Sequence, residues 1–273
     1  MSHPDSAAGV YAPTRRTRIM GILNVTPDSF SDGGLFDDID AAVAQARSMV
    51  AAGADLIDVG GESSRPGHVA VDAETELSRI VPVLRAIMPA ISVPVSIDTT
   101  KAEVAATAFG MGVRMLNDIW GLQRDPDLAP FAAEADVDVV IMHNRETVDA
   151  SLDIIDDMQR FFERSLVIAK EAGIRETRIL LDPGIGFGKV FEQNLVALKN
   201  LELLRAFGFP ILLGASRKSM IGRVLDKPVG ERLTGTLAIN AHAMARGLAD
   251  VIRVHDVAEH FEAHAMIEAI ENA

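Results

Sequence analysis

Short runs of β-branched and aliphatic residues alternate with longer amphipathic segments along the chain. This alternation predicts repeated βα units and a parallel sheet rather than an antiparallel sandwich. Nearly every position in the short runs is apolar, as expected of strands that are buried on both faces. The predicted strands are Ile19–Asn24, Leu56–Gly60, Val93–Ile97, Val113–Asn117, Val137–Met142, Ile179–Asp182, Ile211–Gly214 and Val251–Val254.

The longer segments between these strands have the pattern of helices, and glycines stand where helix C-caps belong. Helices are predicted, among others, over Asp38–Ala52, Lys101–Gly110, Ile154–Ala172, Leu195–Phe207 and Gly230–Gly247. The glycines expected to end helices are Gly53, Gly110, Gly173, Gly208 and Gly247.

Eight βα units without an internal linker predict the α/β class and one (β/α)8 TIM barrel, a single domain over residues 18–273. An open doubly wound sheet is the rival architecture, because it also alternates strands and helices, but it seldom needs eight units. Residues 1–17 mix prolines with charged residues and are predicted to form a flexible N-terminal arm.

The charge and composition of the chain narrow the classes of partner. The formal net charge is −13, which opposes binding to polyanions, so we expect no nucleic acid and no membrane as partners. The chain has no cysteine, which excludes disulfides and thiolate metal sites. Neither a signal-peptide-like stretch nor a run approaching the roughly 18 apolar residues of a membrane helix is visible, and we expect a cytoplasmic protein.

All eight predicted strands end in polar or charged residues. In a barrel these ends converge on the face where the βα loops carry chemistry. Taken singly, Asp98 or Asp182 could be a helix N-cap, and Arg253 could close a salt bridge. Eight polar strand ends in register favour a functional site instead. The segments concerned are residues 24–30, 58–67, 98–101, 117–118, 142–145, 182–184, 216–219 and 253–256.

Three of these loops have recognisable chemistry. The run 184–189 has the spacing GxGxGK, which matches neither a dinucleotide fingerprint nor a P-loop, and predicts a tight turn that a flat ligand can approach. Residues 60–67 offer a hydroxyl and a guanidinium for phosphate oxygens, although a plain surface loop is the alternative. Ser219 opens a predicted helix after two cations, which suits a carboxylate or phosphate.

Taken together, these motifs resemble the dihydropteroate synthase family over the span from Met20 to the C-terminus. The resemblance implies a transferase of folate biosynthesis. It would join 6-hydroxymethyl-7,8-dihydropterin pyrophosphate to para-aminobenzoate, release pyrophosphate and act as a homodimer. The segments that match are Met20–Gly34, Asp58–Gly67, Asp98–Thr99, Asn117–Ile119, Leu181–Lys189, Ser216–Gly222 and Ile252–Val257.

The resemblance also implies which residues bind the pterin and act on it. Asp182 would accept hydrogen bonds from the N3 hydrogen and the 2-amino group, and Asp98 would stabilise a pterin cation after pyrophosphate departs. Asp98, Lys218 and Arg253 are the implied catalytic residues. The implied pterin-binding residues are Asp98, Asn117, Asp182, Phe187, Lys218 and Arg253.

The remaining implied roles concern the two other ligands and the metal. Mg²⁺ is the implied cofactor, with Asn24 as its protein contact. The implied pyrophosphate-binding residues are Asn24, Ser64, Arg65, Arg253 and His255. The implied para-aminobenzoate-binding residues are Phe30, Pro66, Lys218 and Ser219.

The sequence departs from the family pattern at two places and leaves three other functions open. Ser64 replaces a common threonine, and Met142–Thr147 differs from the usual Met-His-Met-Gln-Gly. The other functions are a non-catalytic pterin-binding paralogue, a folate-dependent methyltransferase barrel and a Schiff-base aldolase using Lys218. The motifs around Asn24 and Ser216 speak against the methyltransferase.

Overall fold

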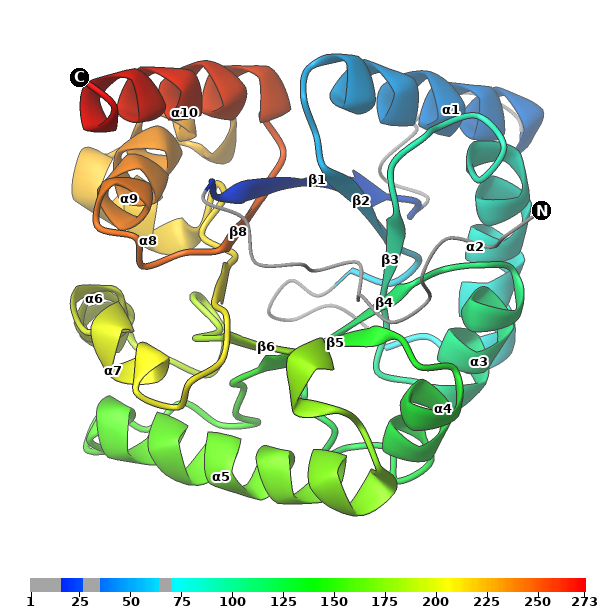
Figure 1. Cartoon of the computed structure of the whole chain (residues 1–273), viewed down its shortest axis with the longest axis horizontal. Helices are drawn as coiled ribbons and strands as arrows, with labels where there is room; N and C mark the ends of the chain where they lie inside the picture. Colours follow the sequence, from blue (N-terminus) through cyan, green and yellow to red (C-terminus); the bar gives the residue numbers. More distant parts are fainter. Residues whose placement is uncertain (1–15, 27–34, 64–69) are drawn as a thin grey trace.

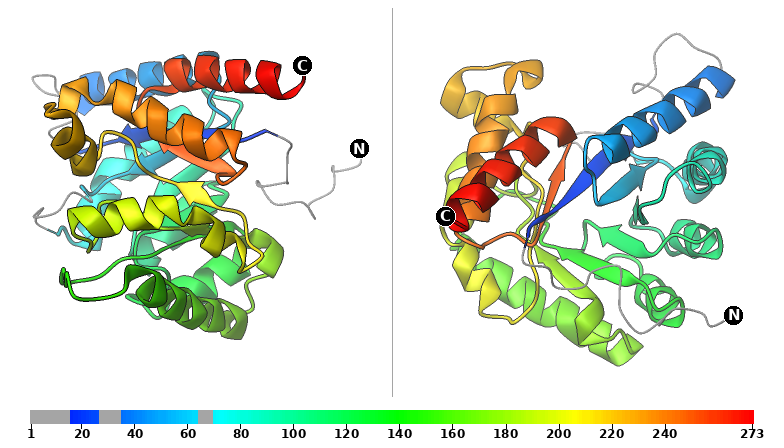
Figure 2. Two further views of the ribbon diagram at one scale, coloured as in Figure 1. Left: turned by 90° about the vertical axis from the view of Figure 1, so that its left-hand side faces the viewer. Right: turned by 45° about the horizontal axis from the view of Figure 1, so that its top comes forward.

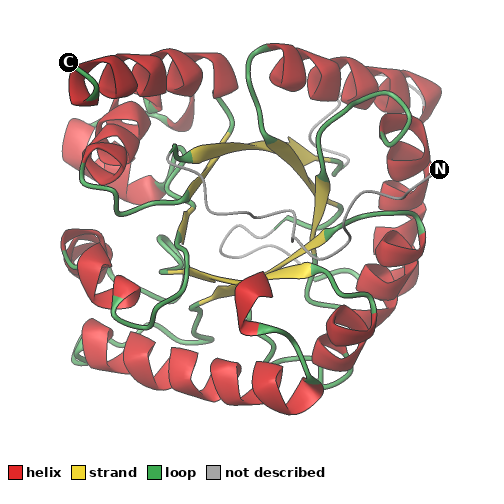
Figure 3. Cartoon of the chain, in the orientation of Figure 1, coloured by secondary structure: helices red, strands yellow, loops and turns green. Residues whose placement is uncertain are grey.

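Eight parallel strands form one sheet that curls into a barrel in the computed structural model, which describes residues 16–26, 35–63 and 70–273 (Figure 1, Figure 3). The hydrogen-bonded order is β6-β5-β4-β3-β2-β1-β8-β7, and a parallel bridge between Leu181 and Ile211 joins the two outer strands. The predicted TIM barrel is therefore confirmed. The strands are β1 Arg18–Asn24, β2 Leu56–Gly60, β3 Val95–Asp98, β4 Met115–Asp118, β5 Asp138–Met142, β6 Ile179–Asp182, β7 Leu212–Leu213 and β8 Val251–Val254.

Helices surround the barrel, and α9 and α10 lie side by side on its outside (Figures 1 and 2). Among the described residues, no helix is long and apolar enough to cross a membrane. The helices are α1 Leu35–Ala51, α2 Ala73–Ile87, α3 Ala102–Gly110, α4 Leu128–Glu134, α5 Ile154–Ala172, α6 Phe191–Lys199, α7 Leu201–Arg205, α8 Ser219–Leu225, α9 Leu233–Ala245 and α10 Val257–Glu271, with short 3-10 turns at Glu176–Arg178 and Val229–Glu231.

Some element boundaries differ from the predicted ones for local reasons. Strand β3 begins after Pro94, which has no N–H to donate to a strand ladder. The predicted helix Leu195–Phe207 is two helices that meet at Asn200, where φ is −112° and ψ is 27°. Gly110 is the last residue of α3, and the left-handed turn that follows is made by Gly112 at φ +100°.

Two hydrophobic clusters form the core, and the inner one supports the polar residues of the candidate site. One lies between the strands and the outer helices, and the other fills the lower part of the barrel interior. Side chains alternate along a strand, so the residue two positions beyond an interior apolar residue also points inward. Asp58, Asn117, Asp182 and Arg253 each follow such a residue by two, and they form a polar layer on top of an apolar plug. The plug consists of Met20, Leu56, Met115, Val140, Leu180, Leu212 and Val251.

Candidate active site

Asp58 is the centre of a buried network at the carboxyl ends of the strands. Its side chain is fully buried, and its Oδ2 accepts hydrogen bonds from Arg253 Nε at 2.6 Å and Asn117 Nδ2 at 3.0 Å. Arg253 Nη2 also donates to Asp98 Oδ2 at 2.7 Å. The hydrogen-bonded side chains come from four strands, β2, β3, β4 and β8. Arg253 forms salt bridges with Asp58 and Asp98, as the alternative interpretation of its sequence position predicted.

The network places two carboxylates around one guanidinium. Burial raises the pKa of Asp98 to about 7, against the attraction of Arg253 and with a further upward push from Asp58. A carboxyl group with such a pKa gains or loses its charge near neutral pH. Groups with strongly shifted pKa values gather at functional sites, because catalytic acids and bases need pKa values that match their task.

Asp182 occupies the end of β6, where burial raises its pKa to about 6 against the pull of the Gly184 N–H and Lys218. Its Oδ1 accepts a hydrogen bond from Gly184 N at 2.7 Å. A Cβ at Gly214 would lie 3.4 Å from Oδ2, so glycine keeps the approach to this oxygen clear. One carboxylate oxygen is therefore anchored by the turn, and the other borders the gap that Gly214 leaves.

Lys218 and Phe187 face each other beside this carboxylate. Lys218 is the N-cap residue of α8, and its Nζ lies 3.9 Å from the centroid of the Phe187 ring. Burial, reinforced by Arg253, lowers the Lys218 pKa to about 8. Gly186 must be glycine here, because a Cβ would lie 2.9 Å from Lys218 Cδ and the residue has φ +86°.

Asn24, His255 and Ser219 lie at three other strand or helix ends. A Cβ on Gly60 would lie 3.7 Å from Asn24 Oδ1 and 3.8 Å from Asp98 Oδ2, so both oxygens border the gap that the glycine leaves. His255 Nδ1 is 2.9 Å from Ser216 Oγ, and Ser219 is the first residue of α8, as predicted.

Several predicted residues cannot be placed in this arrangement. Most of the N-terminal arm, residues 1–15, also lies outside the described part of the chain. The predicted site residues outside the described residues are Phe30, Ser64, Arg65 and Pro66.

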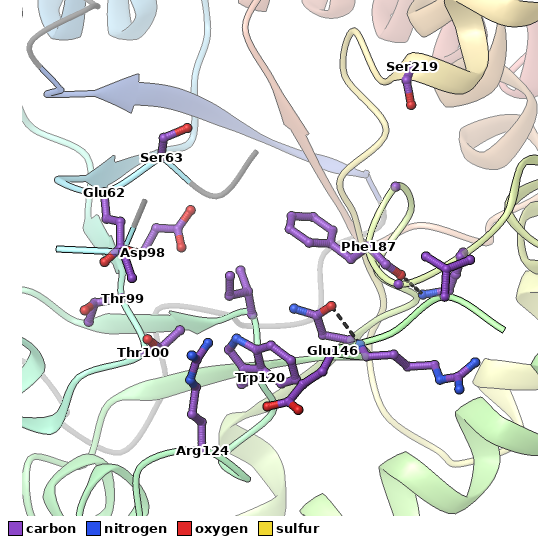
Figure 4. Close-up of a pocket in the computed structure, with 18 of the residues that line it drawn as sticks. Glu62, Ser63, Asp98, Thr99, Thr100, Trp120, Arg124, Glu146, Phe187 and Ser219 are labelled. Carbon is purple, nitrogen blue, oxygen red and sulfur yellow. Dashed lines mark hydrogen bonds between the residues drawn. The ribbon is translucent and has the colours of Figure 1, made fainter. Parts of the chain in front are cut away.

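A cavity of about 1090 Å³ opens at this end of the barrel (Figure 4). Asp98 reaches it from the end of β3, Phe187 from the turn after β6, and Ser219 from the start of α8. Trp120 and Arg124 line it from the segment after β4. Cavities of this size hold small molecules, and this one has both flat apolar surfaces and charged groups.

The sequence interpretation gave no role to two groups that build the site. Asp58 was included only in a polar strand end, and the one sequence feature that could have identified it is a carboxylate inside an otherwise apolar strand. Lys101, after β3, donates to Glu62 and, at 2.6 Å, to the fully buried Glu76. These ion pairs fix the start of the loop after β2 against α2.

The atypical segment after β5 makes contacts within the chain. Asn144 Oδ1 accepts a hydrogen bond from Arg145 N at 2.7 Å, and Arg145 Nε lies 3.3 Å from Asp157 Oδ2 on α5. Side chains that replace the common family residues thus attach this loop to a neighbouring helix. Among the residues that the structure describes, no group of three or more His, Asp or Glu side chains could hold a metal ion.

Comparison with known proteins defines the class of this barrel. The family described as pterin binding enzyme matches residues 20–255. The dihydropteroate synthase of Clostridium beijerinckii is 50% identical over 255 residues, which cover 93% of this chain and 94% of that protein.

Two solved structures have the same fold. Dihydropteroate synthase of Clostridium difficile, crystallised in the presence of pteroic acid, has a TM-score of 0.92 and 47% identity, over 96% of this chain and 100% of that one. The Xanthomonas albilineans enzyme with 4-aminobenzoic acid has a TM-score of 0.91 and 40% identity, over 95% of this chain and 94% of that one. The chain belongs to the dihydropteroate synthase family, which confirms the resemblance inferred from its motifs.

Proposed function

We propose that this barrel joins the methylene carbon of 6-hydroxymethyl-7,8-dihydropterin pyrophosphate to the amine of para-aminobenzoate, giving 7,8-dihydropteroate and pyrophosphate. The observation that carries the proposal is the placement of Asp182 at the end of β6 and of Lys218 at the N-cap of α8, where their opposite charges act on each other's pKa. A buried carboxylate suits a pair of N–H donors, and an ammonium suits a carbonyl oxygen. A pterin ring presents both along adjacent edges.

The polar layer would orient the pterin. Asp182 accepts from the N3 hydrogen and the 2-amino group, while Lys218 donates to the ring carbonyl and the neighbouring ring nitrogen. Asn117 turns its Nδ2 toward the Asp58 carboxylate, which leaves its Oδ1 as an acceptor for the ligand. The Phe187 ring and the Arg253 guanidinium offer flat surfaces to the two faces of the ring.

Pyrophosphate would lie at the β1 and β8 side of the site. Arg253 and His255 come from β8 and its loop, and Asn24 from the end of β1. The Asn24 carbonyl oxygen suits Mg²⁺, an ion that accepts one or two protein oxygens and keeps waters and phosphate oxygens for the rest. Mg²⁺ bound there would neutralise charge on the leaving pyrophosphate. Ser64 and Arg65 would complete this site.

Catalysis would be a dissociative substitution. The C–O bond to pyrophosphate breaks first, and its electron pair leaves with the pyrophosphate. Asp98 then stabilises the pterin cation electrostatically, and the arylamine nitrogen forms the new C–N bond and loses a proton. No side chain acts as a nucleophile, so the rate depends on positioning and on charges that are fixed before the reaction.

The second substrate would bind over the start of α8. Lys218 and Ser219 offer an ammonium and a hydroxyl to the para-aminobenzoate carboxylate. Phe30 and Pro66 would cover its ring.

A homodimer is also proposed. The exposed apolar side chains Met266 and Ile270, one turn apart on α10, support it, since a second copy would bury both. A cytoplasmic location stays a prediction.

The direct test is to mix the protein with the pterin pyrophosphate, para-aminobenzoate and Mg²⁺ and to measure pyrophosphate release. We expect one pyrophosphate for each dihydropteroate formed. Chelation of the metal should slow the rate by about 100-fold or more, since several kcal/mol of leaving-group stabilisation would be lost. Pyrophosphate release that yields no dihydropteroate in the presence of the arylamine would contradict the proposal.

A further inference from the structure

We propose that Lys189 is a positioning residue of the pterin site, which holds the turn of residues 184–187 in the shape that aims Asp182 and Phe187 at the ligand. The inference rests on the proposed function, because it concerns how the same site is built. Lys189 follows the glycine-rich turn and is buried, with 8% of its surface exposed. It also lines the cavity, but its ammonium contacts the turn through backbone carbonyl oxygens, so its effect on Asp182 and on the Phe187 ring would pass through the turn.

The ammonium of Lys189 has a complete set of acceptors. Its Nζ donates to the carbonyl oxygens of Gly184 at 2.9 Å and Phe187 at 3.1 Å, and it lies 2.7 Å from His143 Nδ1. An ammonium has three hydrogens, and these three acceptors satisfy them. Gly184 and Phe187 are the two ends of the turn, which the Phe187 N–H closes on the Gly184 carbonyl at 3.1 Å. Lys189 therefore joins both ends of the turn to the end of β5.

The turn of residues 184–187 in turn fixes the positions of two groups of the site. The N–H of Gly184 fixes Asp182 Oδ1, and the ring of Phe187 lies against Lys218. The backbone at Gly184 lies so close to His143 that the turn cannot shift toward it, because a Cβ on Gly184 would lie 1.8 Å from the His143 carbonyl oxygen. If the ammonium were lost, the Phe187 carbonyl would lose its donor and the Gly184 carbonyl would keep only the Phe187 N–H. The turn would then move to reach other donors. Asp182 and Phe187 would move with it.

His143 is suited to receive this hydrogen bond. Burial, together with Lys189 and Arg145, lowers the pKa of His143 to about 2, so the ring is neutral. We assign its proton to Nε2, which lies 3.1 Å from Asp157 Oδ2, because Nδ1 must accept from Lys189.

The charge of Lys189 acts on the site as well. Burial lowers its pKa to about 7, opposed by Asp182 and Asp157 and assisted by Lys218 and Arg145. Burial raises the pKa of Asp182, and Lys189 acts against this rise, after the Gly184 N–H and Lys218. Removing the ammonium would raise the Asp182 pKa, and the loss of pterin affinity on acidification would then begin at a higher pH.

The test uses Lys189→Met with 6-hydroxymethyl-7,8-dihydropterin as the probe in calorimetry across a pH series. We expect the affinity to fall about 10- to 100-fold at neutral pH, which corresponds to the loss of about one hydrogen bond between a charged group and the ligand. The pH midpoint of the remaining affinity should move upward. Lys170→Met, at an exposed position on α5, is the matched control and should behave as the wild type. Circular dichroism shows whether each variant is folded.

The absence of cysteine allows a chemical rescue. Lys189→Cys, unfolded, alkylated with 2-bromoethylamine and refolded, regains an ammonium at the same chain length, whereas alkylation with 1-bromopropane gives a neutral side chain of equal length. We expect the aminoethyl adduct to recover both the affinity and the pH midpoint, and the propyl adduct to recover neither. Wild-type protein taken through the same steps is the control.

Two results would overturn the inference. One is a folded Lys189→Met variant with wild-type affinity and an unmoved midpoint, and the other is equal recovery by the two adducts. A wild-type protein that does not bind the pterin would contradict the proposed function instead, so the two failures can be told apart.

Discussion

Replacing Asp182 by alanine is expected to abolish measurable pterin binding while the barrel stays folded. The variant loses two charge-assisted hydrogen bonds to the pterin N–H groups, each worth about 1.5–3 kcal/mol. Since 1.4 kcal/mol is a factor of ten, the affinity should fall by about 100-fold or more. Calorimetry with the dihydropterin measures this loss directly.

Asp182→Asn is the matched variant, because it keeps the side-chain volume and the acceptor for the Gly184 N–H. It should lose nearly as much affinity, since an amide donates where the pterin also donates. In the wild type, affinity should fall as the pH drops through about 6, because the raised pKa of Asp182 leaves a protonated carboxyl below that pH. Unchanged pterin affinity in either folded variant would remove Asp182 from the site.

Replacing Lys218 by alanine should reduce kcat/KM by about 100-fold or more, because one ammonium is proposed to contact both substrates. The loss corresponds to two hydrogen bonds that involve charged groups, each worth about 1.5–3 kcal/mol. Steady-state kinetics with each substrate varied in turn should show a rise in both KM values.

Lys218→Met separates the charge of this side chain from its packing. Methionine keeps an apolar stem against the Phe187 ring but carries no ammonium, so it should be nearly as impaired as alanine. Thermal stability should not decrease, because a buried ammonium costs desolvation energy in the free protein. Normal kinetics for the methionine variant would show that the ammonium has no part in the reaction.

The sequence predicted the boundaries of helices and strands correctly where neighbouring residues determine them. Helix α5 runs over the predicted residues Ile154–Ala172 because both of its ends are set by adjacent residues. The Asp153 side chain accepts hydrogen bonds from the first turn, and Gly173 adopts the left-handed C-cap at φ +88°. Strand β6 was likewise predicted to the residue, since an apolar run and a polar end mark its limits.

The connections within the site could not be predicted from local patterns. Asp58 binds Arg253 across 195 residues and Asn117 across 59, so only the closed barrel brings these three side chains together. The strand pattern predicted that their strand ends would share one face, but it did not say which carboxylate would hold which donor. Lys189 illustrates the same limit, because its partner His143 lies 46 residues away on another strand end.

The most direct test of the whole arrangement is a crystal structure with 6-hydroxymethyl-7,8-dihydropterin bound. The N3 hydrogen and the 2-amino group should both point at the Asp182 carboxylate, with Lys218 at the ring carbonyl and Asn117 Oδ1 at an N–H edge. A pterin found elsewhere in the cavity, or bound with its donor edge turned away from Asp182, would contradict the account.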